Sequence, residues 1–131
     1  MDNIHKIWGE RRRILLTRRT EIDLLYLKKD HFCSTHFHSQ KNNKFYVISG
    51  KIKIQTELGE TILTKDEHFT VFPPMVHRFY AIEDSIMIEL AYVKNGAIND
   101  MDIHRKSQGG KIIENKEYTL NELKEKGMLN L

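Results

Sequence analysis

The stretch Thr35-His36-Phe37-His38 decides how this sequence is interpreted. Residues two apart on a β-strand point to the same face, so His36 and His38 would present two imidazoles side by side. Such a pair can hold one metal ion without distorting the backbone, and neutral imidazole suits zinc, copper, nickel or iron. His77, which opens a later apolar segment just after Pro73-Pro74, is the third candidate ligand.

The segments around these histidines predict an all-β fold. Between about residues 21 and 93 the chain consists of short runs rich in Ile, Val, Phe, Tyr and Thr, separated by polar turns. Alternation of polar and apolar residues is strict in Lys51-Ile-Lys-Ile-Gln-Thr56. Pro73-Pro74 must end its strand, because proline cannot donate to a ladder. Short strands at this spacing are typical of a β-barrel or sandwich.

Length and composition predict one globular domain over residues 1–131, with 40% hydrophobic and 30% charged residues. We expect the barrel core at about 21–93, an N-terminal segment at 1–20 and a C-terminal tail at 94–131. In that tail Thr119 and Glu122 have capping-box spacing and Gly127 suits a helix end, which predicts a short helix from about Leu120 to Lys126.

Charge and cysteine usage limit the partners. The net charge of +3 is too small to indicate nucleic acid. The five arginines between Arg11 and Arg19 lack interleaved aromatic residues, so we interpret them as a surface segment. No run approaches the roughly 20 apolar residues that span a membrane, and no signal peptide is visible. The single cysteine, Cys33, is expected to be buried and inert, and it fits a reducing compartment, so we expect a cytoplasmic protein without nucleic-acid or membrane partners.

Two motifs resemble those of the cupin superfamily. His36-x-His38 followed by Phe45-Tyr-Val-Ile-Ser-Gly50 resembles the first cupin motif. Asp66 to His77 resembles the second, with Asp66 at the usual glycine and Pro73-Pro74 at the proline-glycine turn. The resemblance implies a double-stranded β-helix, or jelly-roll barrel, with the short C-terminal helix added. It also implies one divalent transition metal (zinc, nickel, iron, copper or manganese) on the three histidines.

Further segments resemble the cupin domain of type II phosphomannose isomerases. They occur in the same order as in that family: Trp8-Gly9-Glu10, Ile52-Lys-Ile, His77-Arg78-Phe79 and Asp102-Ile103-His104-Arg105. This resemblance implies a mannose-6-phosphate isomerase-like protein that acts on a small-molecule substrate such as a sugar phosphate. Small cupins commonly pair, so a homodimer through edge strands or the N-terminal segment is expected.

The sequence departs from the cupin pattern at the position of the usual glutamate ligand, which is Asn43 here. We predict Asn43 as the fourth ligand, with Gln40 as an alternative oxygen donor and a water molecule as the alternative to both. A centre without carboxylate favours zinc, nickel, copper or iron over manganese. The alternative is that the lost glutamate marks a site in decay, which holds metal weakly or not at all.

Glu89 and Arg78 are the predicted catalytic residues. Glu89 lies in the apolar run Ile86-Met-Ile-Glu-Leu, where a charge is costly unless it is paired, so it is a candidate acid or base. An outward glutamate paired with a surface lysine is the alternative. Arg78 and Arg105 could hold a carboxylate or phosphate in bidentate geometry, and a structural arginine is the alternative.

The remaining expectations concern orientation and function. Tyr46 should point away from the metal, and His68 should be exposed. The expected lining of the barrel interior comprises Phe45, Val47, Phe79 and Met87. Three functions stay open at this point: a metal-dependent sugar isomerase or epimerase, a three-His iron dioxygenase, and a non-enzymatic ligand-binding module. The fold hosts all three and does not choose between them.

Overall fold

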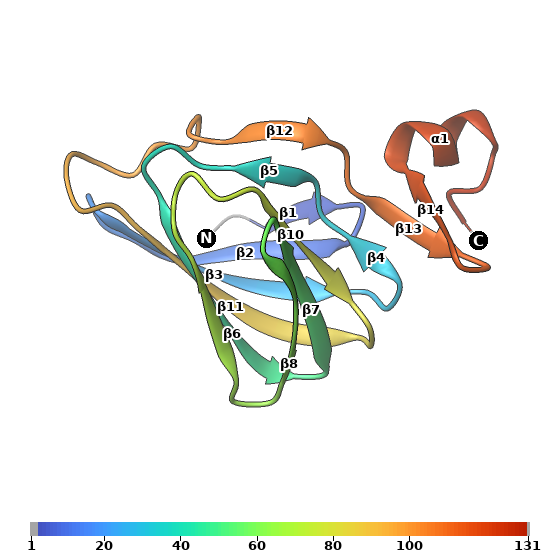
Figure 1. Ribbon diagram of the computed structural model, residues 1–131, viewed down its shortest axis with the longest axis horizontal. Helices are drawn as coiled ribbons and strands as arrows, with labels where there is room; N and C mark the ends of the chain where they lie inside the picture. The colour runs from blue at the N-terminus through green and yellow to red at the C-terminus, as the bar shows by residue number, and fades with distance from the viewer. Residues whose placement is uncertain (1–2, 131) are drawn as a thin grey trace.

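The computed structural model describes residues 3–130, which form fourteen strands and one short helix (Figure 1). The strands are β1 (Asn3–Lys6), β2 (Gly9–Leu16), β3 (Thr20–Leu27), β4 (His31–Phe32), β5 (Thr35–Phe37), β6 (Asn42–Ser49), β7 (Lys51–Thr56), β8 (Gly59–Thr64), β9 (His68–Val71), β10 (His77–Ala81), β11 (Ser85–Tyr92), β12 (His104–Ser107), β13 (Gly110–Ile113) and β14 (Lys116–Thr119), and the helix is α1 (Leu120–Glu125). The predicted all-β fold with a short C-terminal helix is confirmed.

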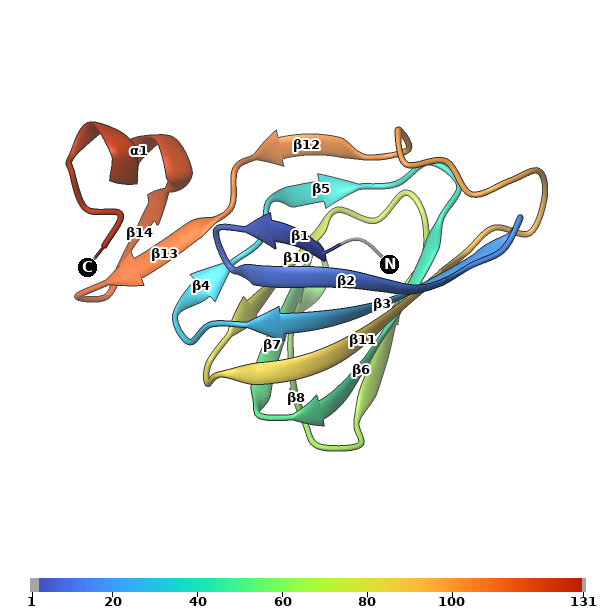
Figure 2. The same ribbon diagram turned by 180° about the vertical axis from the view of Figure 1, so that it is seen from behind.

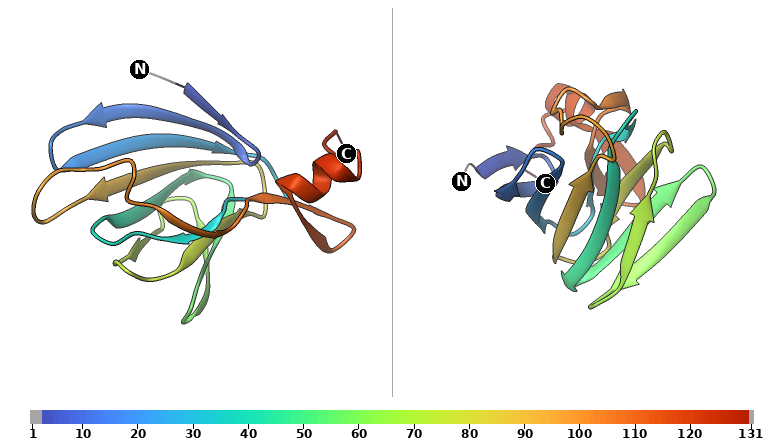
Figure 3. Two further views of the ribbon diagram at one scale, coloured as in Figure 1. Left: turned by 90° about the horizontal axis from the view of Figure 1, so that it is seen from above. Right: turned by 90° about the vertical axis from the view of Figure 1, so that its left-hand side faces the viewer.

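The strands form two sheets that face each other (Figures 1 and 3). The first sheet has the order β1-β2-β3-β11-β6-β9, and the second has the order β12-β5-β10-β4-β13-β14, with the β7–β8 hairpin attached through β10. Neighbouring strands in both sheets are antiparallel, as in β11 with β3 and β10 with β7. The cavity described below lies on the inward faces of these sheets.

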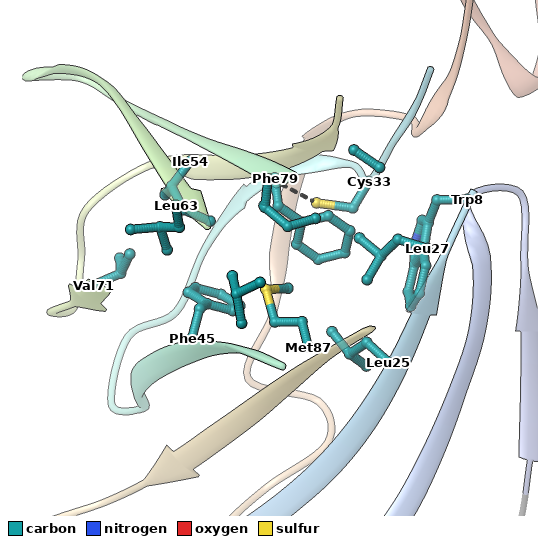
Figure 4. Packing of buried hydrophobic residues seen from close by; sticks show 13 residues of the cluster. Trp8, Leu25, Leu27, Cys33, Phe45, Ile54, Leu63, Val71, Phe79 and Met87 are labelled. Carbon is teal, nitrogen blue, oxygen red and sulfur yellow. Dashed lines mark hydrogen bonds between the residues drawn. The ribbon is translucent and has the colours of Figure 1, made fainter. Parts of the chain in front are cut away.

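The hydrophobic core fills the space between the sheets because burial alternates along each strand. In β3, Leu25 and Leu27 are buried and face Met87 of β11 and Phe45 of β6 in one cluster (Figure 4). Each such side chain contributes about 1.5–3 kcal/mol when it leaves water. The prediction for the barrel interior is confirmed, since the buried cluster includes Phe45, Val47, Phe79 and Met87.

The core extends beyond the expected range of residues 21–93. Strand β2 pairs with β3 along most of its length and adds the N-terminal segment to the first sheet. Trp8, just before β2, is 6% exposed, and its ring meets Phe79 edge-on with centroids 5.1 Å apart. The N-terminal segment is therefore part of the packed structure.

The C-terminal tail also adds strands and then ends in the predicted helix. Strand β12 pairs with β5, and β13 pairs with both β4 and β14. At the start of α1, the Thr119 side chain accepts a hydrogen bond from the Glu122 amide and the Glu122 carboxylate accepts one from the Thr119 amide, so the capping box is complete. Among residues 3–130 no helix is long and apolar enough to cross a membrane.

The backbone conformation explains why the motifs have glycine at position 50 and tolerate aspartate at position 66. Gly50 has a φ of +90°, and a Cβ there would lie 2.2 Å from the Oγ and 2.7 Å from the Cα of Ser85. Asp66, which replaces the usual glycine, has a φ of +68° in the left-handed region, where aspartate is among the few tolerated residues. The hydroxyl of Tyr46 donates to the Asp66 carboxylate over 2.7 Å, so Tyr46 points away from the histidines, as predicted.

Candidate metal centre

Three buried histidines meet where the end of β5 lies beside the start of β10. One ligating atom from each of His36, His38 and His77 lies within 4.8 Å of the other two. His36 is on β5, His38 directly follows it, and His77 opens β10, where it pairs in register with His36. All three side chains are buried, at 8%, 5% and 2% exposed. The structure thus brings together the three ligands predicted from sequence.

Each imidazole is oriented by a backbone carbonyl. Nδ1 of His36 lies 2.8 Å from the Ser34 carbonyl, and Nδ1 of His77 lies 3.0 Å from the Met75 carbonyl. Nδ1 of His38 lies 2.6 Å from the Asp102 carbonyl. A carbonyl only accepts hydrogen bonds, so we assign the ring proton to Nδ1, which leaves the lone pair on Nε2.

The Nε2 atoms are available for coordination. Nε2 of His38 and of His77 is buried and has no hydrogen-bond partner among residues 3–130. A buried nitrogen without a partner is costly unless another group supplies the missing contact. Carbonyls that hold Nδ1 while Nε2 stays bare are the usual outer contacts of histidine ligands, so the residues present fit a divalent transition metal.

Burial keeps the imidazoles neutral. Together with the neighbouring imidazoles, burial lowers the pKa of His36 to about 3. Burial likewise lowers the pKa of His38 to about 4, and it lowers the pKa of His77. Neutral imidazole is the form that binds metal, so the site is preorganised at neutral pH.

Asp102 holds the loop that carries His38, a role that we did not predict. Its carbonyl accepts the Nδ1 proton of His38. Its carboxylate accepts the backbone N–H groups of Ser39 (2.7 Å), Gln40 (2.9 Å) and Lys41 (3.1 Å). Burial alone would raise the pKa of Asp102, but these three hydrogen bonds hold it below the ordinary value.

Asn43 lies in the cavity next to the histidines, whereas Gln40 does not line it. Asn43 is 2% exposed, and its Nδ2 donates to Oε2 of Glu89 over 2.7 Å. The amide oxygen is buried and has no hydrogen-bond partner among residues 3–130. Of the two oxygen donors considered, only Asn43 therefore has a free acceptor atom in the cavity of the histidines.

His36 and His38 line a cavity of about 450 Å³. Its walls include Trp8 and Phe79 on the apolar side and Glu89 on the polar side. Burial raises the pKa of Glu89. Asp23 is paired with Glu89 across β3 and β11, and burial with the nearby Glu21 and Glu89 charges raises the pKa of Asp23 to about 7. The Asp23 carboxyl, which exchanges its proton near neutral pH, therefore lines the same cavity as His36 and His38.

Three further charged residues belong to this cavity, although we did not predict them there. Lys41 is 8% exposed, lines the cavity and has no carboxylate within 4.0 Å among residues 3–130. Nε of Arg11 lies 3.6 Å from Oδ2 of Asp23. Glu21 is also buried, lines the cavity and contacts Arg13.

The interpretation of residues 11–19 as a plain surface segment is therefore wrong for Arg11 and Arg13. Both lie on β2, where Arg12 between them is exposed. Alternation on a strand sends Arg11 and Arg13 inward and Arg12 outward, so strand periodicity across this segment was the sequence signal that could have found them.

Arg78 does not reach the site. It lies between His77 and Phe79 on β10, and alternation turns it to the opposite face. Its guanidinium binds the Glu117 carboxylate through two contacts of 2.8 and 2.7 Å and lies 4.7 Å from the centre of the Phe32 ring. The predicted catalytic role does not fit this position, and the structural alternative does.

Cys33 behaves as expected. It is 4% exposed, and its Sγ accepts the Phe79 backbone N–H over 3.2 Å. Burial raises the pKa of its thiol to about 12. The thiolate, which is the reactive form, is therefore not available near neutral pH.

Comparison with known proteins gives the fold its name. No family model matches the chain, and no curated protein matches it. Among solved structures, an RmlC-like cupin from Shewanella frigidimarina aligns with a TM-score of 0.60 and 17% identity over 66% of this chain and 77% of that chain. The chain has the cupin fold. KdgF from a Halomonas species gives a TM-score of 0.66 and 18% identity, covering 72% of this chain and 88% of that chain.

A third structure extends the likeness to nearly the whole chain. Ectoine synthase from P. lautus has a TM-score of 0.64 and 16% identity, covering 88% of this chain and 86% of that chain. At these identities the likeness establishes the cupin fold. The chemistry has to be argued from the residues of the site.

Proposed function

We propose that this cupin is a metal-dependent isomerase or epimerase of a sugar or sugar derivative. The observation that carries the proposal is that two members of the three-histidine cluster, His36 and His38, line one cavity together with the carboxylates of Glu89 and Asp23. The Nε2 atoms of His38 and His77 have no hydrogen-bond partner among residues 3–130. Sugar as the substrate class rests on the resemblance of four segments to the cupin domain of type II phosphomannose isomerases.

A divalent ion on His36, His38 and His77, with Asn43 as the candidate fourth ligand, would polarise a substrate carbonyl and acidify the neighbouring C–H bond. Glu89 then acts as the base, because burial raises its pKa towards the range where a carboxylate accepts and returns protons. The Asn43 amide donates to one carboxylate oxygen of Glu89 and fixes its orientation.

Groups that line the cavity can accept and donate every proton that the proposed reaction moves. In an isomerisation, Glu89 removes the proton from the carbon next to the carbonyl and returns it to the former carbonyl carbon. A second proton passes from the neighbouring hydroxyl to the carbonyl oxygen, and we assign this transfer to Lys41. In an epimerisation, Glu89 keeps the proton that it removes from one side of the carbon, and a second acid donates another proton from the opposite side, a role that we also assign to Lys41. Neither reaction needs an external oxidant.

The orientation of the imidazoles argues against a site in decay. All three Nδ1 atoms keep their carbonyl partners, and Asp102 adds three hydrogen bonds to the loop after His38. Contacts of this kind orient histidine ligands at metal centres. We therefore propose an intact metal centre, with Asn43 in place of the usual carboxylate.

Exchange of carbon-bound hydrogen with solvent tests the function. The metal-loaded protein, prepared with zinc, nickel or manganese, is incubated in D₂O with a panel of aldoses, ketoses, their phosphates and sugar acids. We expect loss of the proton signal at the carbon next to the carbonyl for at least one member. Glu89→Gln should slow this exchange at least about 100-fold without loss of metal, whereas the exposed Glu60→Gln should not. No exchange with any member contradicts the proposal.

The absence of a carboxylate ligand favours an iron dioxygenase as the second candidate. Three neutral ligands leave open positions for substrate and oxygen. Oxygen uptake by the iron-loaded protein would support this function, and proton exchange without oxygen uptake would support the isomerase. We favour the isomerase because Glu89, Asp23 and Lys41 bring proton-carrying groups into the cavity. A binding module would bind its ligand without either reaction.

We also propose a homodimer, formed through the outer face of β3, β11 and β6. Among residues 3–130, no other segment of the backbone lies over this face in Figure 2. Its apolar side chains retain accessible surface, and they are Ile22, Leu24 and Tyr26 of β3, Ile86, Ile88 and Leu90 of β11, and Tyr46 and Ile48 of β6. They pair across strands, as in Leu24 with Ile88, so the patch is continuous.

The size of the patch suits a second copy of the chain. From strand dimensions it measures roughly 350–450 Å² in projection, and its accessible area is larger. An apolar patch of this size can form the centre of an interface, and a standard interface buries about 800 Å² per partner. One face can meet its own copy about a two-fold axis. This location differs from the edge strands and the N-terminal segment expected from sequence.

Molar mass by light scattering tests the dimer. We expect twice the 15.5 kDa of the chain for the wild type, and 15.5 kDa for Ile88→Lys. Ile62→Lys on β8, where the side chain is 53% exposed on the other sheet, is the control and should stay dimeric. A monomeric wild type, or a dimeric Ile88→Lys, contradicts the proposal.

We further propose a cytoplasmic location. The single cysteine, Cys33, is buried and has no partner for a disulfide within the chain, which suits a reducing compartment. Fractionation of cells that produce the chain should recover it with cytoplasmic markers, and recovery in a secreted fraction would contradict this location.

A further inference from the structure

The cavity has its acidic and basic groups on different strands. The carboxylates of Glu21, Asp23 and Glu89 come from β3 and β11. Three cations line the same cavity from other strands: Lys6 of β1, Arg11 of β2 and Arg105 of β12. The cavity therefore has a basic side, defined by Lys6, Arg11 and Arg105, that the proton transfer proposed above does not use.

Arg105 is directed to the metal centre by the pairing of its strand. It lies directly opposite His36 in the β12–β5 register, and cross-strand partners share a face of the sheet. The next residue, Lys106, takes the other face, where its Nζ lies 5.8 Å from the ring centre of the outward Phe37. The sequence thus alternates one inward and one outward cation.

Lys6 lies close enough to both arginines to be affected by their charges. Partial burial lowers the pKa of Lys6, and the charges of Arg11 and Arg105 lower it further. The basic side is therefore a group of three cations gathered at one wall. Like charges at such separation repel one another, and an anion between them relieves the repulsion.

The cations of the basic side are poorly compensated by the chain itself. Among residues 3–130, neither Lys6 nor Arg105 has a carboxylate within 4.0 Å. Nε of Arg11 is buried without a hydrogen-bond partner, and its nearest carboxylate oxygen, on Asp23, is 3.6 Å away. Donors of these three side chains are left for a ligand.

We propose that Lys6, Arg11 and Arg105 bind an anionic group of the substrate, a phosphate or a carboxylate, while its reacting oxygens lie at the three histidines. The arginine fork suits both anions, and a lysine adds a further donor. The identity of the remaining substrate rests on the proposed function. Taken with that function, the basic side restricts the substrate to sugar phosphates or sugar acids.

Anion binding to the whole chain after chelator treatment tests this subsite without any turnover. Inorganic phosphate and glycolate are each titrated at low ionic strength, and binding is followed by amide chemical shifts, which also report the folded state. We expect saturable binding with shifts at the basic side. Lys6→Met and Arg105→Met should each weaken it at least about tenfold, and the double variant should abolish it. The outward Lys106→Met is the matched control and should bind like the wild type.

The outcomes distinguish a phosphate from a carboxylate as the bound anion. They also test the anion subsite separately from the proposed isomerase function. Tighter binding of phosphate indicates a sugar phosphate, and tighter binding of glycolate indicates a sugar acid; both support the subsite. Absence of saturable binding, or equal binding by all variants, overturns it. Anion binding without proton exchange would refute the isomerase and keep the subsite, and exchange on uncharged sugars without anion binding would refute only the subsite.

Discussion

Nδ2 of Asn43 donates a hydrogen bond of 2.7 Å to Oε2 of Glu89, so the residue at the usual cupin glutamate position connects the candidate metal centre to the candidate base. A carboxylate at position 43 could not make this bond, because it has no proton to donate when ionised. The exchange of glutamate for asparagine therefore removes a charge beside the histidines and adds a donor that orients Glu89.

Asn43→Asp should reverse both effects. The new carboxylate loses the bond to Glu89 and adds a buried like charge, so the metal-free protein should lose about 1–3 kcal/mol of unfolding free energy at pH 8. Manganese, which prefers oxygen ligands, should bind about tenfold more tightly. Urea unfolding and a manganese titration followed by electron paramagnetic resonance measure the two effects.

The control for that variant is Asn42→Asp. The side-chain amide of Asn42 donates to the Tyr92 carbonyl over 3.3 Å, and Asn42 does not line the cavity. It should leave manganese affinity unchanged. If Asn43→Asp and Asn42→Asp bind manganese equally, Asn43 lies outside the coordination sphere.

Asp102→Ala should weaken metal binding through His38. The variant keeps the backbone carbonyl but leaves the amides of residues 39–41 without their acceptor, which loosens the loop behind the ligand. We expect metal affinity to fall about 10- to 100-fold. Asp100→Ala, which removes an exposed partner of Arg13, should change affinity little. Competition with a chromophoric chelator measures both, and equal affinities would contradict the role of Asp102.

Gly50→Ala should destabilise the fold more than Gly59→Ala. Both glycines have positive φ, +90° and +133°, but only at Gly50 would a Cβ meet other atoms, at 2.2 Å from Ser85 Oγ. Backbone strain alone costs about 1–3 kcal/mol at either position, and the clash adds to it at Gly50. Urea midpoints compare the two variants. Equal losses would show that the approach of Ser85 does not require glycine.

Asp23 should make stability fall as the pH rises towards neutrality. Burial, with the charges of Glu21 and Glu89, raises its pKa from 3.8 to about 7 in the folded protein. Between these values the folded state holds a proton that the unfolded state has released, so the unfolding free energy decreases with rising pH. Asp23→Asn lacks this contribution to the pH dependence of stability. The buried histidines contribute equally to the pH dependence of both proteins.

Urea unfolding of the metal-free wild type and Asp23→Asn from pH 5 to pH 8 measures that difference. The stability of the wild type relative to the variant should decline up to about pH 7 and then level off, because 7 is the raised pKa. Two curves that run parallel over the whole range would contradict the raised pKa.

Local patterns were sufficient to predict the histidines and the helix. His36 and His38 share a face through strand alternation, and Thr119 and Glu122 cap α1 through a fixed spacing. These features depend on residues that are close in sequence. The position of His77 after Pro73-Pro74 made it a candidate, and the cupin motifs joined it to His36 and His38 because the family resemblance relates segments that are distant along the chain.

Contacts between distant segments could not be predicted in the same way. Asp102 reaches His38 across 64 positions, and no spacing indicates such a bond. Arg78 was assigned to the site from residue type, but the face of β10 that it occupies turns it to Glu117. Glu21 and Asp23 lie on the buried face of β3, and the pairing of β2 with β3 brings Arg13 to Glu21 and Arg11 to Asp23.

Metal content of the purified protein is the most direct test of the central claim that His36, His38 and His77 form a metal centre. After incubation with zinc and removal of excess ion, elemental analysis should find about one equivalent in the wild type and in His68→Ala, whose histidine is exposed as the sequence predicts. The variant His36→Ala/His77→Ala loses two of three nitrogen ligands and should retain no stoichiometric metal. A wild type that takes up no ion, or a double variant that holds as much metal as the wild type, would contradict the account.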